Sequence, residues 1–187
     1  MPGSDADVLI VLERSERRWI DRPLDFIGVN VYTRHFAYHD PKTPLLEAMI
    51  DPDFTPKGAA TTTMGWEIYP RAMYETLKRV KEWGDPVVYV TENGASFDDR
   101  VEGGVVNDQA RIEFLQRYLT EVRQAMREGV KVKGYFVWSL LDNFEWTFGF
   151  NKRFGLVYTD FADGRRVPKA SAFWYRELIE RGGFCCE

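Results

Sequence analysis

Residues 86–96 read PVVYVTENGAS, a run of β-branched and aromatic residues that ends on the ionisable side chain of Glu92. The run predicts a strand buried on both faces, as in a parallel sheet, because it lacks the apolar-polar alternation of a strand with one wet face. Burying a lone carboxylate costs several kcal/mol, roughly, unless hydrogen bonds or an opposite charge offset it. Glu92 is therefore either a satisfied structural group or a chemically active one, and the surrounding sequence is needed to distinguish the two.

Two further runs share this character, at residues 24–32 and 134–139. Apolar residues at helical spacing follow each run and predict helices at residues 70–83, 108–129 and 169–181. Either Asn107 or Asp108 can cap the second helix. The order βαβαβα predicts an α/β fold with parallel crossovers, and no linker divides it, so residues 1–187 are expected to form one domain.

Side chains capable of binding or chemistry fall at the C-terminal end of every expected strand. Asn30 and Tyr32 end the first strand, Glu92 the second and Trp138 the third. In a (β/α) barrel the C-terminal ends of the strands form the face that carries the active site. A long loop is expected at residues 40–63, where α/β proteins place functional segments. Each side chain alone is more often structural, but their shared position favours a site.

The bulk composition excludes several classes of function. A formal net charge of -4 with two histidines gives no basic surface for nucleic acid. No apolar run reaches the length of a membrane span. The first basic side chains follow the apolar segment at residues 8–12, whereas a secretory signal has basic residues before it, so a cytoplasmic location is expected. Cys185 and Cys186 have no metal-ligand spacing around them, and no metal or cofactor is expected. The aromatic fraction of 15% suits either a well-filled core or a carbohydrate site.

Three ordered motifs resemble glycoside hydrolase family 1, the β-glucosidase group, namely VTENG at 90–94, WSLLDNFEW at 138–146 and RFGL at 153–156. Two further segments are similar to the family, GVNVYT at 28–33 and MGWEIYP at 64–70. Val31 stands where the family is expected to have a second tyrosine, on the opposite face of the strand from Tyr32. The resemblance covers residues 23–174 and implies the C-terminal three βα units, six to eight, of a (β/α)8 TIM barrel, completed by another chain or segment.

By that resemblance the chain contributes to a retaining β-glycosidase. Glu92 is implied as the nucleophile that forms a covalent glycosyl-enzyme, and Tyr32 as the hydroxyl that hydrogen-bonds its carboxylate. Asn30 is implied beside the same subsite. Glu145 is implied as the acceptor for two adjacent sugar hydroxyls, which suits a carboxylate with two acceptor oxygens.

The remaining implied sugar contacts are aromatic side chains, namely Trp138, Trp146, Phe154 and, on the aglycone side, Trp66. Trp146 and Phe154 are open to a second interpretation as plain core residues. Asp142 is expected to order its loop rather than to catalyse. Glu67 and Arg71 are expected, as an alternative to a functional role, to form an exposed pair at a helix start.

A retaining glycosidase needs a second carboxyl group about 5 Å from the nucleophile, acting as general acid and base. In the family this glutamate lies in a Thr-x-Asn-Glu-Pro segment, which does not occur in these 187 residues. A TIM barrel takes about 250 residues, whereas three βα units are found. The expected partners are therefore a β-glycoside substrate and a complementary N-terminal barrel fragment carrying the acid/base glutamate. Residues 1–22 match the family poorly.

Two other functions stay open. A non-catalytic sugar-binding remnant or fragment would use Trp138, Glu145 and Trp146 without hydrolysis. An unrelated α/β protein would have to carry the motifs by chance, which several independent matches in the expected structural context disfavour.

Overall fold

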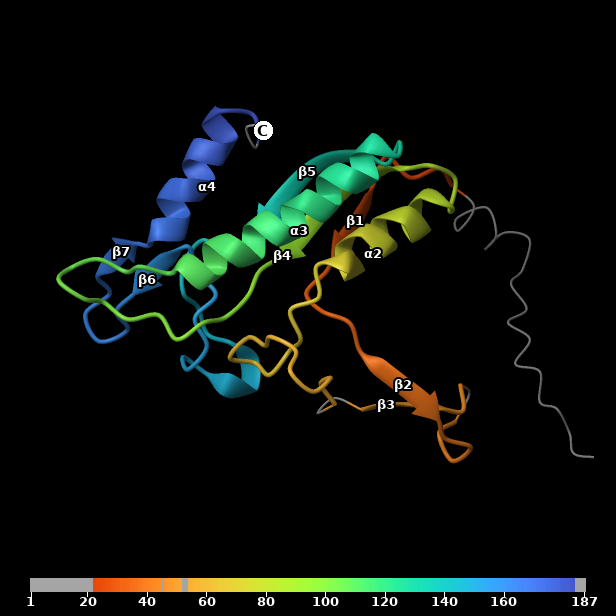
Figure 1. Cartoon of the computed structure of the whole chain (residues 1–187), viewed down its shortest axis with the longest axis horizontal. Coiled ribbons are helices and arrows are strands. Elements are labelled where there is room, and N and C mark those ends of the chain that lie inside the picture. Colours follow the sequence, from red (N-terminus) through yellow and green to blue (C-terminus); the bar gives the residue numbers. More distant parts are fainter. Residues whose placement is uncertain (1–21, 45, 52–53, 184–187) are drawn as a thin grey trace, which may run out of the picture.

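The computed structural model describes residues 22–44, 46–51 and 54–183 (Figure 1). Cys185 and Cys186 lie outside the described residues, as does the poorly matched N-terminal segment apart from Arg22. None of the described helices combines the length and the hydrophobicity of a membrane span.

A three-stranded parallel sheet forms the centre of the fold. β1 (Ile27–Asn30) and β5 (Lys131–Val137) flank β4 (Val87–Asn93), and both pairings are parallel. The prediction of three parallel strands is confirmed, although β5 begins three residues before the expected start at residue 134. β1 and β5 are the two edges of this sheet in the described part of the chain.

Helices follow the strands at the positions that the sequence predicted: α2 (Arg71–Lys81), α3 (Gln109–Arg127) and α4 (Ala170–Glu180). Figure 1 shows α2 and α3 lying along the same side of the sheet. The apolar stripe of α2 is buried at Met73 and Leu77, and it packs in one cluster with Val88 and Val90 of β4 and with Tyr118 of α3. Burial of such a stripe, rather than helix propensity, supplies most of the stability of a helix in a folded protein.

The opposite face of the sheet is more open, which corrects the expectation of strands buried on both sides. Phe26 and Phe136 are 52% and 56% exposed, and Thr91 is also exposed. Alternate side chains of a strand point to opposite faces, so half of each apolar run faces away from the helices. The continuous apolar character of the runs therefore leaves apolar side chains exposed on the second face in the described part of the chain.

The long loop predicted at residues 40–63 contains regular structure, and that prediction is wrong for part of its length. β3 (Ala48–Asp51) pairs antiparallel with β2 (Phe36–His39), and this hairpin projects away from the sheet in Figure 1. A second unpredicted pair joins β6 (Val157–Thr159) to β7 (Arg166–Pro168). These strands have three or four residues each, too few for a periodic signal to be distinguished.

Two polar side chains have partners other than those expected. Asp108 occupies the N-cap position of α3, but its carboxylate makes no capping bond and instead accepts hydrogen bonds from Arg111 and Ser171. Glu67 does not pair with Arg71; it receives a two-pronged contact from Arg34, at 2.8 and 3.0 Å. In both cases a better-placed cation was available nearby in space.

Candidate active site

A cavity of about 520 Å³ opens at the C-terminal ends of the parallel strands. Its lining consists of Asn30, Tyr32, Met64, Trp66, Glu92, Trp138, Glu145, Trp146, Thr147, Phe148 and Phe154. All eight side chains that the sequence predicted as site residues belong to this lining. The structure thus brings together residues from four separate segments of the chain.

Glu92 and Tyr32 form the central polar contact of the cavity. The Tyr32 hydroxyl donates a hydrogen bond to Glu92 Oε2 at 2.7 Å. Burial raises the pKa of Tyr32 well above its usual range, and the hydrogen bond and negative charge of Glu92, with that of Glu145, raise it further. Tyr32 therefore stays protonated at neutral pH and remains a hydrogen-bond donor to the carboxylate.

Backbone bonds hold the strand ends beneath this pair. Val31 N donates to the carbonyl of Glu92 at 2.9 Å, and the buried side-chain amide of Asn93 donates through Nδ2 to the Val31 carbonyl at 2.6 Å. Trp138 N in turn donates to the Asn93 carbonyl at 2.9 Å, which joins β4 to the end of β5. The next position, Gly94, has to be a glycine because a Cβ atom there would lie 1.8 Å from the Trp138 carbonyl oxygen. The TENG sequence thus places a carboxylate where three strand ends meet.

Asn30 is anchored by a neighbouring strand residue. Thr91 Oγ1 donates to Asn30 Oδ1 at 2.6 Å. Because this bond uses the amide oxygen, the NH2 group is the end of Asn30 that can bind a sugar hydroxyl or a carboxylate.

Glu145 enters the cavity from the loop after β5. It is 8% exposed and immediately precedes the short helix η1 (Trp146–Phe148). Burial raises the pKa of Glu145, a hydrogen bond from Asn143 opposes this, and the charge of Glu92 raises it further. Two carboxylates therefore share one partly desolvated cavity, an arrangement suited to ligands rich in hydroxyl donors.

Aromatic rings form one wall of the cavity. The rings of Tyr32, Trp66 and Phe154 contact one another with centroid separations of 5.6, 6.2 and 6.4 Å. Phe154 is 1% exposed, so it is a core residue that also lines the cavity. Trp146 is 82% exposed, which excludes its interpretation as a core residue in the described part of the chain.

Three lining residues were missed from the sequence: Met64, Thr147 and Phe148. Each lies within two positions of a predicted site tryptophan, so adjacency to the motifs was the available signal. Asp142 was predicted to order its loop, and it does so by accepting hydrogen bonds from Gly155 N at 2.9 Å and Arg153 at 2.6 Å. Among the described residues, no group of three or more His, Cys, Asp or Glu side chains is placed to hold a metal ion.

Parallel βα units with candidate site residues at the C-terminal ends of their strands are the building units of (β/α) barrels, the class of fold of which this chain forms a part. Residues 4–184 match Glycosyl hydrolase family 1, and the chain belongs to that family. It is 47% identical over 166 residues to Beta-glucosidase A of Thermotoga maritima, and 44% identical over 175 residues to a bifunctional beta-D-glucosidase/beta-D-fucosidase of Bifidobacterium breve.

The comparisons also define how much of a barrel is present. The match covers 88% of this chain but 36% of the Thermotoga maritima protein, and 86% of this chain but 38% of the Bifidobacterium breve protein. The structure superposes on a family 1 β-glucosidase from Thermotoga maritima with a TM-score of 0.84 and 42% identity, covering 92% of this chain and 38% of that one. The described fold is therefore a partial TIM barrel.

Proposed function

We propose that residues 1–187 form a single partial domain, units six to eight of the TIM barrel of a retaining β-glycosidase, and that this portion supplies the nucleophile Glu92. The observation that carries the proposal is the 2.7 Å hydrogen bond from Tyr32 to Glu92 inside a cavity lined by carboxylates and aromatic rings. Retaining glycosidases work through a carboxylate placed beside the sugar ring.

In the proposed reaction Glu92 attacks the anomeric carbon as the aglycone oxygen leaves with a proton from a separate general acid. The bond from carbon to Glu92 forms while the bond from carbon to the aglycone breaks, which gives a glycosyl ester. Water then attacks the same carbon, gives its proton to the former acid and releases Glu92. Tyr32 fixes one carboxylate oxygen by its hydrogen bond, leaving the other directed at the substrate.

The other lining residues would bind the sugar. Glu145 would accept hydrogen bonds from two glycone hydroxyls, and Asn30 would donate to a hydroxyl or to Glu92. Trp138 and Trp146 would face the sugar ring and Phe154 would close the glycone end. Trp66 would form a wall on the aglycone side. The names of the relatives support a β-glucoside as the substrate, with a β-fucoside as a related possibility.

The general acid and the rest of the barrel would come from a complementary part carrying the first five βα units, either as another polypeptide or as the remainder of a longer chain. Three features support this: the coverage of 36% to 38% of the relatives, the two edges of the sheet and the exposed inner face at Phe136. A largely apolar groove of about 660 Å³ between β5 and α4 would receive the next unit.

The test uses a complemented barrel, defined as this chain co-expressed with the part of Thermotoga maritima Beta-glucosidase A that lies outside the matched region. Incubation with 2,4-dinitrophenyl 2-deoxy-2-fluoro-β-D-glucoside should leave one sugar bound covalently to each barrel. The fluorine slows both the formation and the hydrolysis of the glycosyl ester, whereas the good leaving group speeds only its formation, so the ester accumulates. Peptide mapping should find the sugar at Glu92. A label on Glu145 would contradict the assignment of the nucleophile.

The alternative of a non-catalytic sugar-binding remnant gives a different result in the same experiment. Glucose would bind to the complemented barrel, no dinitrophenolate would be released and no peptide would be labelled. The chain without its complement should hydrolyse aryl glucosides at a trace rate at most, since proton donation alone contributes about 10²- to 10⁴-fold.

A further inference from the structure

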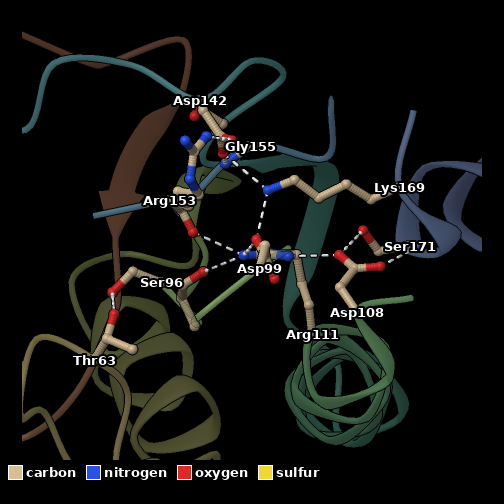
Figure 2. Close-up of polar contacts among 12 residues, drawn as sticks. Thr63, Ser96, Asp99, Asp108, Arg111, Asp142, Arg153, Gly155, Lys169 and Ser171 are labelled. Atoms are coloured by element: carbon tan, nitrogen blue, oxygen red, sulfur yellow. Dashed lines mark hydrogen bonds and ion pairs between the residues drawn. The ribbon is translucent and has the colours of Figure 1, made fainter. Parts of the chain in front are cut away.

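A buried cluster of charged side chains lies beside the cavity, and none of its members is used in the proposed reaction. It consists of three carboxylates and three cations, namely Asp99, Asp108, Asp142, Arg111, Arg153 and Lys169 (Figure 2). All except Arg153 are buried. Equal numbers of opposite charges and many hydrogen bonds are what makes such burial tolerable.

One half of the cluster joins two helices. Asp108 at the start of α3 accepts hydrogen bonds from Ser171 N at 2.8 Å and from Arg111 and the Ser171 hydroxyl at 2.5 Å each. Ser171 belongs to α4, so this half fastens α4 to α3. In the described part of the chain, Asp108 and Ser171 make no hydrogen bond to a residue that lines the cavity.

The other half fastens the neck of the loop at residues 143–153. Asp142 and Gly155 lie at the two ends of this loop, where Gly155 N donates to Asp142 Oδ1 at 2.9 Å and Asp142 N donates to the Val157 carbonyl at 3.0 Å. A Cβ atom on Gly155 would lie 2.2 Å from Asp142 N, so the two strands of the neck are in direct contact. The loop carries four of the cavity-lining residues, Glu145, Trp146, Thr147 and Phe148.

Lys169 connects the two halves. Its side chain is 0% exposed, and its ammonium group donates to Asp142 Oδ1 at 2.8 Å and to Asp99 Oδ2 at 2.6 Å. Its backbone N–H donates to the Leu156 carbonyl at 2.9 Å, beside the neck. Burial and the charge of Arg111 lower the pKa of Lys169, and the charges of Asp99 and Asp142 offset only part of that lowering. The contacts with these two carboxylates are the interactions that oppose the cost of burying the ammonium.

We propose that Lys169 is a positioning residue for substrate binding: through Asp142 it fixes the neck of loop 143–153 and so sets where the Glu145 carboxylate stands relative to Glu92. This inference rests on the proposed function, which gives Glu145 its role in binding the substrate. The position of the loop can nevertheless be measured without turnover. A misplacement of about 1 Å at such a group is enough to lower binding or catalysis by about 10²-fold.

The experiment compares the double variant Lys169→Met with Asp99→Asn against Ser171→Ala in the complemented barrel. The double variant removes one cation and one anion, so the cluster stays balanced, but Asp142 loses the ammonium. Ser171→Ala is the matched control because Ser171 is a buried residue of α4 two positions away whose hydroxyl contacts Asp108 instead. Two readouts are hydrogen–deuterium exchange of residues 143–153 and the calorimetric dissociation constant of deoxynojirimycin, a ligand of the Thermotoga maritima relative.

We expect faster exchange in the loop and a dissociation constant raised by about 10- to 10²-fold in the double variant, with both near the wild-type values in Ser171→Ala. Unchanged exchange and binding in the double variant would overturn the proposal. Equal effects in the two proteins would also overturn it, since they would indicate general destabilisation. If the double variant does not assemble, Asp142→Asn gives the same test, because it keeps an acceptor for Gly155 N and removes the charge that faces Lys169. A wild-type barrel that binds deoxynojirimycin without hydrolysing glucosides would contradict the proposed function and leave this test intact.

Discussion

The two carboxylates of the cavity, the proposed nucleophile Glu92 and the proposed sugar-binding residue Glu145, are positioned in different ways. Glu92 and Tyr32 stand at the ends of neighbouring parallel strands, where backbone hydrogen bonds such as Val31 N to Glu92 O fix their spacing. Glu145 stands on a loop whose regular structure is the three-residue η1, and a buried charge cluster fastens the neck of that loop. The sheet therefore supplies the geometry of the first group, and side-chain contacts supply that of the second.

The largest effect should come from the strand-end carboxylate. Glu92→Gly in the complemented barrel should lower kcat by about 10⁴-fold or more, because a covalent mechanism cannot proceed without its nucleophile. Added azide should restore part of the turnover of an activated glucoside by attacking the anomeric carbon from the vacated space. The product of that rescue should be the α-glucosyl azide, identified by NMR.

The matched control for this variant is Asp98→Gly, which removes an exposed carboxylate on the segment after the same strand. Its kinetics should be those of the wild-type barrel. A β-glucosyl azide from Glu92→Gly would assign Glu92 as the general acid and base instead of the nucleophile. Wild-type turnover without azide would show that Glu92 is a structural group.

The loop carboxylate should give the next largest effect. Glu145→Ala should lower kcat/KM for aryl β-glucosides by roughly 3 kcal/mol or more of transition-state binding, since hydrogen bonds to a charged group contribute about 1.5–3 kcal/mol each. The unfolding temperature should remain close to that of the wild type, because no ion pair is lost. Glu102→Ala, on an exposed turn, provides the kinetic control. Equal kcat/KM values in the two variants would remove Glu145 from the site.

A smaller effect is expected when the hydroxyl that supports Glu92 is removed. Tyr32→Phe keeps the ring that contacts Trp66 and Phe154 but deletes the donor to Glu92. One charge-assisted hydrogen bond contributes about 1.5–3 kcal/mol, so kcat/KM should fall about 10- to 10²-fold. Tyr38→Phe, at an exposed position of β2, should have no effect. A loss in Tyr32→Phe as large as that in Glu92→Gly would assign Tyr32 a more direct chemical role.

The smallest expected effect concerns stability and pH. The pKa of Glu145 is raised in the folded protein by burial and by the charge of Glu92, so the folded state binds a proton more tightly than the unfolded chain. Stability contributed by this group is full below its unfolded pKa and falls as pH rises through the folded value. Glu145→Gln should therefore have a higher free energy of unfolding than the wild type at neutral pH, and this difference should be smaller at pH 4. Urea denaturation of both proteins at the two pH values measures it. A decrease at neutral pH would show that Glu145 is stabilised by a partner rather than strained.

Much of the architecture could be predicted from local sequence because the buried positions of strands and helices are apolar at a regular spacing. The apolar runs around residues 24–32, 86–91 and 134–139 correspond to the three parallel strands, and the stripes between them correspond to the helices. Membership of the cavity followed from the same signal, since side chains at the C-terminal ends of parallel strands share one face. The other four predicted residues, Trp66, Glu145, Trp146 and Phe154, needed the family motifs, because none of them lies at the end of a parallel strand.

Other features could not be predicted because their partners are distant in sequence. Glu67 pairs with Arg34, which is 33 residues away, rather than with Arg71 on the same turn. The β2–β3 hairpin lies in a stretch rich in proline and threonine, where pairing rather than propensity creates the strands.

The sequence by itself determined the order of the three parallel strands and their helices, the family and eight of the eleven residues around the cavity, since these depend on local patterns and on motifs of fixed spacing. Only the tertiary structure decided which charges could be buried. Lys169 is separated from Asp99 by 70 residues and from Asp142 by 27, yet all three side chains meet in the interior. A buried ammonium is stable only where opposite charges and hydrogen bonds surround it, and that environment exists after distant segments have packed together.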